Sequence, residues 1–378
     1  MDAVVVGGGI AGSSAAYHLA DAGVRTRLID RGDEGRATDA GAGILAPAFG
    51  SRTDSEAWFR VATDAVAYYR DLDAALASDD TGFVERPLLE VAVGAADADE
   101  LDRALDRARD RAERLDTPAP GSLTTLDPAR ARDLFPPLAD VARAVRYDDA
   151  AQVDGRRFAA ALRTAGERAG LTVEAGDVER IRTADGRVTG VVADGTARSA
   201  DAVVVAGGAW SGAFADDLGT SLPVEPMRGQ IVHLDVAPDD GAATATDDWP
   251  ILSTTERCYA VPWPGGRVAV GATYEEGSGF VPYPDVRGVR TVLSRAERVA
   301  PGLADAALRE VRVGLRPGTP DGLPVVGAVP GVEGAFVATG FGPTGLQMGP
   351  YAGRLVADLV CGRAPPADLS AFGVERFG

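Results

Sequence analysis

Apolar and polar positions change period twice within the first 30 residues. Ala3–Val6 is an apolar run with the length of a buried strand. Ala11–Ala22 follows as a helical segment that Gly23 closes, and Val24–Ile29 is a second apolar run that ends at Asp30. The pattern predicts a βαβ unit of about 30 residues.

The rest of the chain divides into helical, strand and mixed stretches. Helices are expected over Ser55–Ala77 with Ser55 as N-cap, Ala98–Leu115 and Asp154–Ala169, and strands over Thr172–Glu174, Val178–Thr183, Val188–Ala193 and Ala200–Gly208. From Pro223 to about Ala304 the pattern is mainly β, with GQIVHLDV, CYAVPW and RVAVGATY at strand length. The stretch GAFVATGFGPTGLQMGPYAGRLVADLV predicts a strand, a glycine turn and a helix.

This order predicts an α/β chain, α+β overall, in which a discontinuous Rossmann-like nucleotide-binding domain carries an inserted antiparallel-β domain. We expect the nucleotide-binding domain to comprise residues 1–80, 146–220 and 306–378. The substrate-binding domain is expected to comprise residues 81–145 and 221–305.

The first βαβ unit carries a glycine motif, GGGIAG, between its first strand and its helix. Gly7 allows the tight turn, Gly9 lets backbone N–H groups approach a pyrophosphate, and Gly12 lets the helix pack closely on the strand. The helix N-terminus then faces the phosphates, and Asp30 can accept hydrogen bonds from ribose hydroxyls. The motif predicts a dinucleotide site.

Later glycine-rich turns favour FAD over NAD as this dinucleotide. RATDAGAGIL, AGGAWS and GFGPTGLQ follow one another along the chain, and the last of them begins a helix near the C-terminus. A helix N-terminus there can stabilise negative charge on a reduced flavin ring. An NAD enzyme needs no such C-terminal segment at its cofactor.

Composition excludes several classes of protein. Asp and Glu number 56 against 38 Lys and Arg, a net charge of -18, which argues against a nucleic-acid partner and suits a salt-rich cytosol. The sequence contains no lysine, so a lysine-linked PLP enzyme and a P-loop lysine are excluded. With two histidines, and with Cys258 far from Cys361, we expect no metal site and no Ser-His-Asp triad.

The chain shows no targeting or membrane signal. Its first strand begins at residue 2 or 3, which leaves no room for a signal peptide, and no run of 18 apolar residues exists. We expect a cytoplasmic protein, or one peripheral to the inner face of the membrane.

Seven blocks along the chain resemble the D-amino-acid oxidase family of flavoproteins, nearest to glycine oxidase and related amino-acid oxidases and dehydrogenases. The blocks are VVVGGGIAGSSAAYHLA, ATDAGAGIL, ADAVVVAGGAWS, MRGQIVHL, CYAVPWPGGRVAVGATY, GLRPGTPDGLPVVG and ATGFGPTGLQMGP. The resemblance implies FAD held by Gly7, Gly9, Ile10, Ala11, Gly12, Asp30, Arg31, Ala37, Thr38, Ala42, Gly43, Ile44, Val178, Gly208, Gly342, Pro343, Thr344, Gly345, Leu346 and Gln347. It also implies that Arg316, in GLRPGT, binds the substrate carboxylate, as a guanidinium can through a bidentate pair.

The sequence departs from the family pattern in four places. Pro343 replaces a second arginine of glycine oxidase, Arg257 replaces a histidine, and Tyr274 replaces a methionine. Arg257 and Tyr274, together with Tyr259 of the block CYAVPWPGGRVAVGATY, are candidate active-site residues. Gly314 stands where related sarcosine oxidases attach FAD through a cysteine, so we expect a non-covalent flavin.

The resemblance implies oxidative deamination of a small amino acid, a D-amino acid or a glycine-like one, by hydride transfer from Cα to flavin N5. The alternatives are a dehydrogenase of secondary amines such as sarcosine or proline, and a flavin subunit of a larger electron-transfer complex. The electron acceptor (O2, a quinone or another carrier) and homo-oligomerisation stay open.

Overall fold

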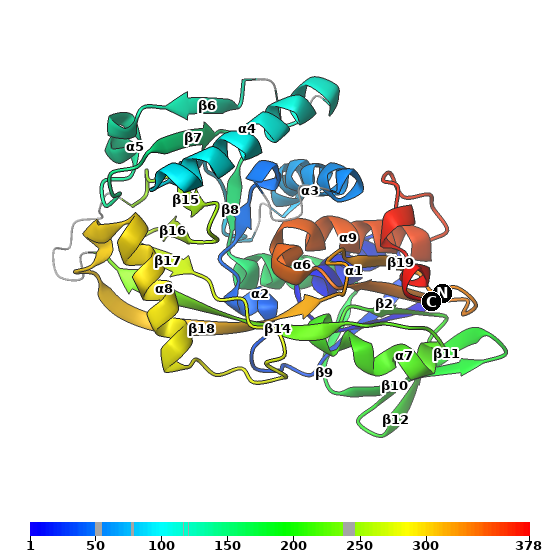
Figure 1. The fold of residues 1–378 in the computed structure, drawn as a ribbon. Helices are drawn as coiled ribbons and strands as arrows, with labels where there is room; N and C mark the ends of the chain where they lie inside the picture. Colours follow the sequence, from blue (N-terminus) through cyan, green and yellow to red (C-terminus); the bar gives the residue numbers. More distant parts are fainter. Residues whose placement is uncertain (50–54, 77–78, 116, 120, 237–245) are drawn as a thin grey trace.

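The computed structural model describes residues 1–49, 55–76, 79–115, 117–119, 121–236 and 246–378. Two large β-sheets organise these residues, and the long strands β14 and β18 run between the two halves (Figure 1). One end of a segment expected from the sequence, Ala77 of the helix that begins at Ser55, lies outside the described residues.

The first sheet is Rossmann-like. In spatial order its strands are β19 (Val325–Ala328), β20 (Ala335–Thr339), β13 (Ala202–Val205), β1 (Asp2–Val6), β2 (Arg25–Asp30) and β9 (Thr172–Ala175). Neighbours pair in parallel, except that β19 runs antiparallel to β20. Because both faces of the sheet are covered, its central strands are continuous apolar runs. This confirms the expected α/β fold.

Helices cover one face of this sheet, and a small sheet covers the other. The helical layer comprises α1 (Ile10–Asp21), α3 (Glu56–Ala75), α6 (Gly155–Arg168) and α9 (Gly345–Val360). The opposite layer comprises β10 (Val178–Ala184), β11 (Arg187–Ala193), β12 (Thr196–Ser199) and α7 (Ala215–Leu218). The predicted N-cap of α3 is confirmed, since Ser55 Oγ accepts a hydrogen bond from Trp58 N at 3.2 Å.

The second sheet has eight strands and is antiparallel except where β5 pairs with β15. In spatial order they are β18 (Ala307–Gly318), β14 (Glu225–Asp235), β17 (Arg267–Gly271), β16 (Tyr259–Trp263), β15 (Ile251–Thr254), β5 (Leu88–Ala92), β7 (Arg143–Tyr147) and β6 (Leu123–Leu126). α5 (Pro128–Leu134) and α8 (Val286–Val299) pack on one face, and α4 (Ala95–Leu115) packs near β5 and β7. A smaller sheet holds β3 (Ile44–Leu45), β8 (Ala151–Val153) and β4 (Phe83–Glu85), and α2 (Ala37–Ala40) precedes β3.

Helix α8 lies inside the stretch that the sequence pattern gave as mainly β. Its apolar stripe, which includes Val292, Ala296 and Val299, is narrow and stands among arginines, so the pattern hides it. Asp285 caps the helix, because its Oδ1 accepts from Gly288 N at 2.8 Å. Strand β18 pairs with β14 in the eight-stranded sheet, although the segment that begins at residue 306 was expected in the nucleotide-binding domain. The domain boundaries stay a prediction.

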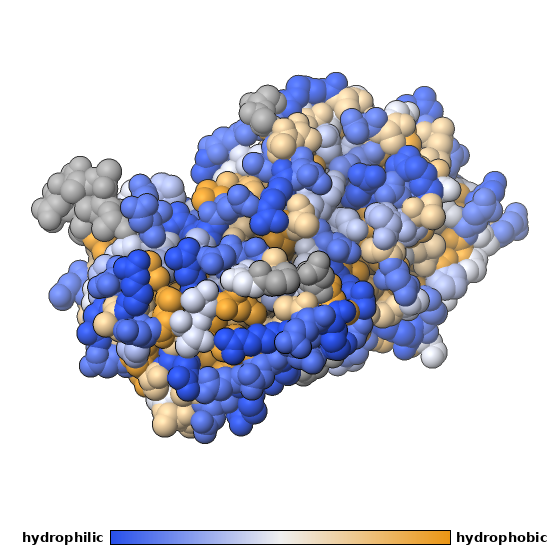
Figure 2. Space-filling view, turned by 90° about the horizontal axis from the view of Figure 1, so that it is seen from above, coloured by the Kyte–Doolittle hydropathy of each residue, from blue (hydrophilic) through white to orange (hydrophobic). Residues whose placement is uncertain are grey.

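Figure 2 shows a mostly hydrophilic face with hydrophobic residues visible in recesses between polar ones. Within the described part of the chain, no helix combines the length and the apolar character that crossing a bilayer requires.

Candidate active site

A cavity of about 810 Å³ is lined by residues of both large sheets. Gly7 and Asp30 follow β1 and β2 of the first sheet, and Tyr259 and Arg316 come from β16 and β18 of the second. A volume of this size is typical of a site that encloses a cofactor or ligand. The fold therefore brings segments more than 300 residues apart in sequence to one site.

The cavity collects nearly all the site residues expected from the sequence. Its lining includes Gly7, Gly9, Ile10, Ala11, Asp30, Arg31, Ala37, Thr38, Ala42, Gly43, Ile44, Val178, Gly208, Arg257, Tyr259, Tyr274, Arg316, Gly342, Pro343, Thr344, Gly345, Leu346 and Gln347. Gly12 is not part of the lining. A Cβ at Gly12 would overlap the carbonyl oxygen of Gly7, so Gly12 allows α1 to pack against the turn.

The glycine turn leaves the start of α1 open. Gly7 has φ +101, and a Cβ there would lie 2.6 Å from the carbonyl oxygen of Ala206. Gly9 is the N-cap residue and has no side chain that could occupy the free N–H groups. One of these groups, Ile10 N, donates to Thr38 Oγ1 at 3.0 Å. The remaining geometry is that of an anion site at a helix N-terminus.

The charged side chains beside this turn pair with each other. Arg36 Nη1 donates to Asp30 Oδ2 at 2.5 Å, and Arg36 Nη2 donates to Asp39 Oδ2 at 3.0 Å. Arg31 donates in the same way to Asp33 and Asp177. Arg36 lines the cavity and was not among the predicted residues, although it begins the quoted block RATDAGAGIL.

The C-terminal glycine turn supplies a second open helix start. α9 begins at Gly345, and its N-cap residue Thr344 makes no side-chain cap hydrogen bond. Gln347 Oε1 accepts from Ala46 N at 3.0 Å, while Gln347 Nε2 is buried and has no partner among the described residues. Since an unpaired buried donor is costly, this amide is suited to a ligand acceptor in the cavity.

Two glycines of the eight-stranded sheet make room for the predicted catalytic side chains. A Cβ at Gly229 would overlap the guanidinium of Arg316, and a Cβ at Gly271 would lie 2.5 Å from Tyr259 Oη. Because glycine has no Cβ, the side chains of Arg316 and Tyr259 can lie directly over the backbone of the sheet at these two positions. Arg316 Nη1 donates to the carbonyl oxygen of Thr273 at 3.0 Å.

Tyr274 contacts both arginines of the site. Its ring centre lies 4.5 Å from the guanidinium carbon of Arg316 and 5.0 Å from that of Arg257, within the range of cation–π attraction. Arg257 has φ +61, an uncommon backbone conformation for a residue other than glycine, in the turn between β15 and β16. Among the described residues, no carboxylate forms an ion pair with Arg257 or Arg316.

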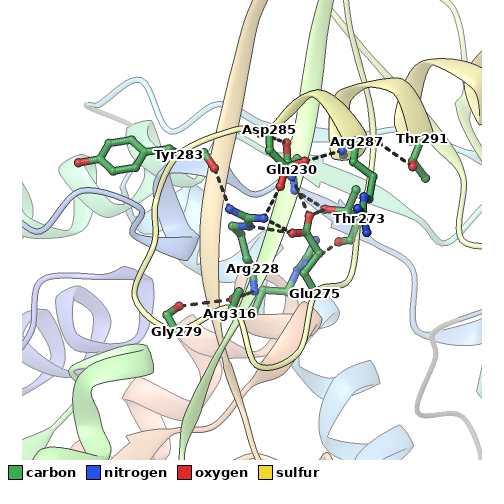
Figure 3. A network of polar contacts seen from close by, with 12 residues as sticks. Arg228, Gln230, Thr273, Glu275, Gly279, Tyr283, Asp285, Arg287, Thr291 and Arg316 are labelled. Atoms are coloured by element: carbon green, nitrogen blue, oxygen red, sulfur yellow. Dashed lines mark hydrogen bonds and ion pairs between the residues drawn. The ribbon is translucent and has the colours of Figure 1, made fainter.

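A polar network holds the segment that carries Thr273 and Tyr274 (Figure 3). Glu275 Oε1 accepts from Thr273 Oγ1 at 2.6 Å and from Gln230 Nε2 at 2.8 Å, and Glu275 Oε2 accepts from Arg228 Nε at 2.8 Å. Burial alone would raise the pKa of Glu275, but the hydrogen bonds from Thr273, Arg228 and Gln230 together lower it. The network therefore contains an ionised carboxylate that fixes the residue whose carbonyl binds Arg316.

Two further polar residues of the cavity were missed from the sequence. Glu90 and Ser253 are register partners on β5 and β15, and both line the cavity. Burial raises the pKa of Glu90 to about 8, while a hydrogen bond with Ser253 opposes the shift. The only feature of the sequence that could have indicated Glu90 is its position as an acid inside the apolar segment LLEVA.

The fold and the cavity define a class, the proteins in which a Rossmann-like dinucleotide-binding sheet and a second, largely antiparallel sheet enclose one site. The family model described as "FAD dependent oxidoreductase" (DAO) matches residues 2–359, and the chain belongs to this family. The resemblance drawn from the sequence is thus confirmed.

Individual relatives cover almost the whole chain. The chain is 40% identical to the oxidoreductase YurR of Bacillus subtilis, over 98% of this chain and 97% of that protein. It is 33% identical to glycine oxidase of Pseudomonas aeruginosa, over 98% and 97% of the two chains. The structure of iminodiacetate oxidase from Chelativorans sp. BNC1 superposes with a TM-score of 0.91 at 35% identity, over 98% of each chain.

The protein is thus an FAD-dependent amine or amino-acid oxidoreductase, and its cavity fits the cofactor. The glycine turn offers open N–H groups that would hold the pyrophosphate of FAD, and Asp30, at the end of β2, would accept hydrogen bonds from its ribose. Gln347, whose Nε2 has no partner among the described residues, and the uncapped start of α9 line the same cavity, where they suit the polar edge of a flavin.

Proposed function

We propose that this protein oxidises an amino acid at the Cα–N bond, with Arg316 binding the substrate carboxylate. The observation that carries the proposal is the Arg316 guanidinium, which lies in the cavity without a carboxylate partner among the described residues. A guanidinium in this state offers a bidentate site for a carboxylate. FAD, when bound, supplies the acceptor of the hydride from Cα, and the imino acid then hydrolyses to an oxo acid and ammonia.

The residues around Arg316 have separate tasks in this proposal. The Thr273 carbonyl and the Tyr274 ring hold the guanidinium in one orientation, so that the substrate Cα is presented in a fixed position. Burial raises the pKa of Tyr259, so its phenol stays protonated at neutral pH and can donate a hydrogen bond. Tyr259 is therefore a positioning donor and not a base.

The decisive experiment is anaerobic reduction of the purified flavoprotein. Both enantiomers of a panel of amino acids, with glycine, sarcosine and proline, are added without oxygen, and the flavin absorbance near ~450 nm is followed. Bleaching by an amino acid, with release of ammonia, supports the proposal. A flavin that no amine bleaches overturns it, and bleaching only in the presence of another protein favours a subunit of a larger complex. The rate at which colour returns in air separates an oxidase from a dehydrogenase.

A second candidate function is oxidation of a secondary amine that bears two carboxylates, and Arg257 favours it. Its guanidinium contacts the same Tyr274 ring as Arg316, so two cations share one wall of the cavity. The similar iminodiacetate oxidase is named for such a substrate. For this candidate, Arg257→Ala should raise KM for iminodiacetate far more than KM for sarcosine. Equal effects on the two substrates would reject it.

A further inference from the structure

A partly buried arginine lies behind the glycine turn, outside the cavity. Arg163 belongs to α6, and its Nη1 donates to the carbonyl oxygen of Gly8 at 2.9 Å and to Ser13 Oγ at 3.1 Å. Ser13 Oγ donates to the same carbonyl oxygen at 3.1 Å, and Ser13 is fully buried. Gly8 and Gly9 line the cavity, whereas Arg163 is not part of the lining. A residue 155 positions later in the chain therefore holds one peptide of the turn.

The carbonyl that Arg163 holds decides where the next N–H points. The peptide bond between Gly8 and Gly9 is trans, and in a planar trans peptide the C=O and the following N–H point in opposite directions. Since the Gly8 carbonyl points toward Arg163, the N–H of Gly9 points away from it. Glycine is conformationally permissive, so a Gly-Gly peptide keeps one orientation only where other groups fix it. Arg163 and Ser13 are two such groups.

Arg163 also brings a positive charge to the back of the turn. Its hydrogen bonds go to a carbonyl and a hydroxyl, and among the described residues no carboxylate forms an ion pair with it. Burial and then the charge of Arg36 lower the pKa of Arg163, while more distant carboxylates oppose the shift, and the guanidinium stays charged at neutral pH. Arg36, by contrast, is paired with Asp30 and Asp39. A partly buried cation without an ion-pair partner is unfavourable, so an anion bound at the turn would offset its charge.

We propose that Arg163 is a positioning residue for FAD, which orients the Gly8–Gly9 peptide so that the Gly9 N–H faces the pyrophosphate and offsets the negative charge of that group from behind the turn. Backbone N–H groups of a glycine turn are the donors that bind a pyrophosphate. The glycine motif itself contains no cation, so Arg163 adds a charge that the motif does not predict. The proposal concerns the cofactor and does not depend on which substrate is oxidised.

The first experiment measures the Kd of FAD for matched variants of the full chain. Free FAD is separated from diluted holoprotein by ultrafiltration and measured by its absorbance. Arg163→Met keeps an unbranched side chain without charge or donors, and the Kd should rise roughly tenfold to a hundredfold, since a charge-assisted hydrogen bond is lost. Arg163→Lys keeps the charge and a donor, and it should bind FAD more tightly than Arg163→Met. Arg157→Met is the control with an unchanged Kd, because Arg157 of the same helix forms an exposed ion pair with Asp80.

Two results would overturn the proposal. An unchanged Kd in Arg163→Met would show that the turn does not need this arginine. A Kd of Arg163→Lys as high as that of Arg163→Met would leave Arg163 only a packing role, because the two side chains are similar in length. If Arg163→Met does not fold, Ser13→Ala is decisive. It removes one donor to the Gly8 carbonyl, so the Kd should rise roughly threefold to tenfold, and an unchanged Kd would reject the proposal.

A second experiment locates the effect at the pyrophosphate. ADP and adenosine are added to the holoprotein as competitors, and the FAD that each releases is measured in the same way. ADP carries the diphosphate and adenosine lacks it, so Arg163→Met should weaken competition by ADP and leave that by adenosine unchanged. Equal weakening of both would place the effect elsewhere in the site and would also overturn the proposal. None of these measurements needs turnover. Failure of the proposed function looks different, because no amino acid would then reduce the flavin while the Kd values stay as expected.

Discussion

At the nucleotide end of the cavity, charged side chains pair with one another, whereas at the opposite end they face the cavity alone. Arg36 binds Asp30 and Asp39 near the glycine turn. Arg316, on the eight-stranded sheet, has no carboxylate partner among the described residues, and burial keeps Glu90 of the same sheet protonated at neutral pH. Paired charges can form a rigid site for a cofactor that stays bound, while the unpaired guanidinium of Arg316 is free to bind the carboxylate of the proposed substrate. Four substitutions test this contrast.

The largest effect is expected at the nucleotide end, where the backbone itself forms the site. Gly12→Ala places a Cβ against the carbonyl oxygen of Gly7, so α1 must move away from the turn. We expect the protein to be purified without FAD and to lose flavin absorbance and activity together. Gly94→Ala is the control, since the nearest atom to its Cβ would lie at 3.5 Å. Full retention of FAD by Gly12→Ala would contradict the packing argument.

Arg316→Ala removes the proposed carboxylate ligand at the other end. We expect KM for the amino-acid substrate to rise roughly a hundredfold, because a bidentate charge-assisted pair is lost, while FAD stays bound. Steady-state kinetics and the flavin spectrum measure the two quantities. Arg309→Ala, on the same strand and in an exposed ion pair with Asp235, should change neither. An unchanged KM in Arg316→Ala would remove Arg316 from the site.

Glu275→Gln tests whether the network in Figure 3 positions Arg316. Arg228 and Gln230 donate to different oxygens of Glu275, and glutamine has an NH2 donor in place of one of them, so one bond is lost and the Thr273 carbonyl should lose its fixed place. We expect KM to rise roughly fivefold to tenfold, with kcat changed less. Glu310→Gln breaks a comparable pair with Arg312 that does not touch Thr273, and it should leave KM unchanged. Equal effects of the two variants would indicate a general loss of stability.

Glu90→Gln should alter the dependence of stability on pH. Burial raises the pKa of Glu90 from 4.5 to about 8, so the folded protein holds a proton that the unfolded chain releases between these values. The free energy of unfolding of the wild type should therefore fall as pH rises through this window, by up to ~1.4 kcal/mol per pH unit from this group. The variant lacks this slope, so the difference between the two proteins grows from about pH 5 to pH 9. Urea unfolding of both proteins at these values measures it, and parallel curves would contradict a buried acid.

The sequence alone determined the nucleotide end because that end is local. A strand, a glycine turn, a helix and a second strand within 30 residues follow from apolar periodicity and from the steric need for glycine. The tertiary structure decided the other end. Glu90, Ser253 and Arg316 line one cavity because β5, β15 and the distant β18 belong to one sheet, and no local pattern encodes such pairings. Whether a buried polar atom finds a partner is a property of the packed fold, so the unpaired Glu90 and Thr255 became visible only there.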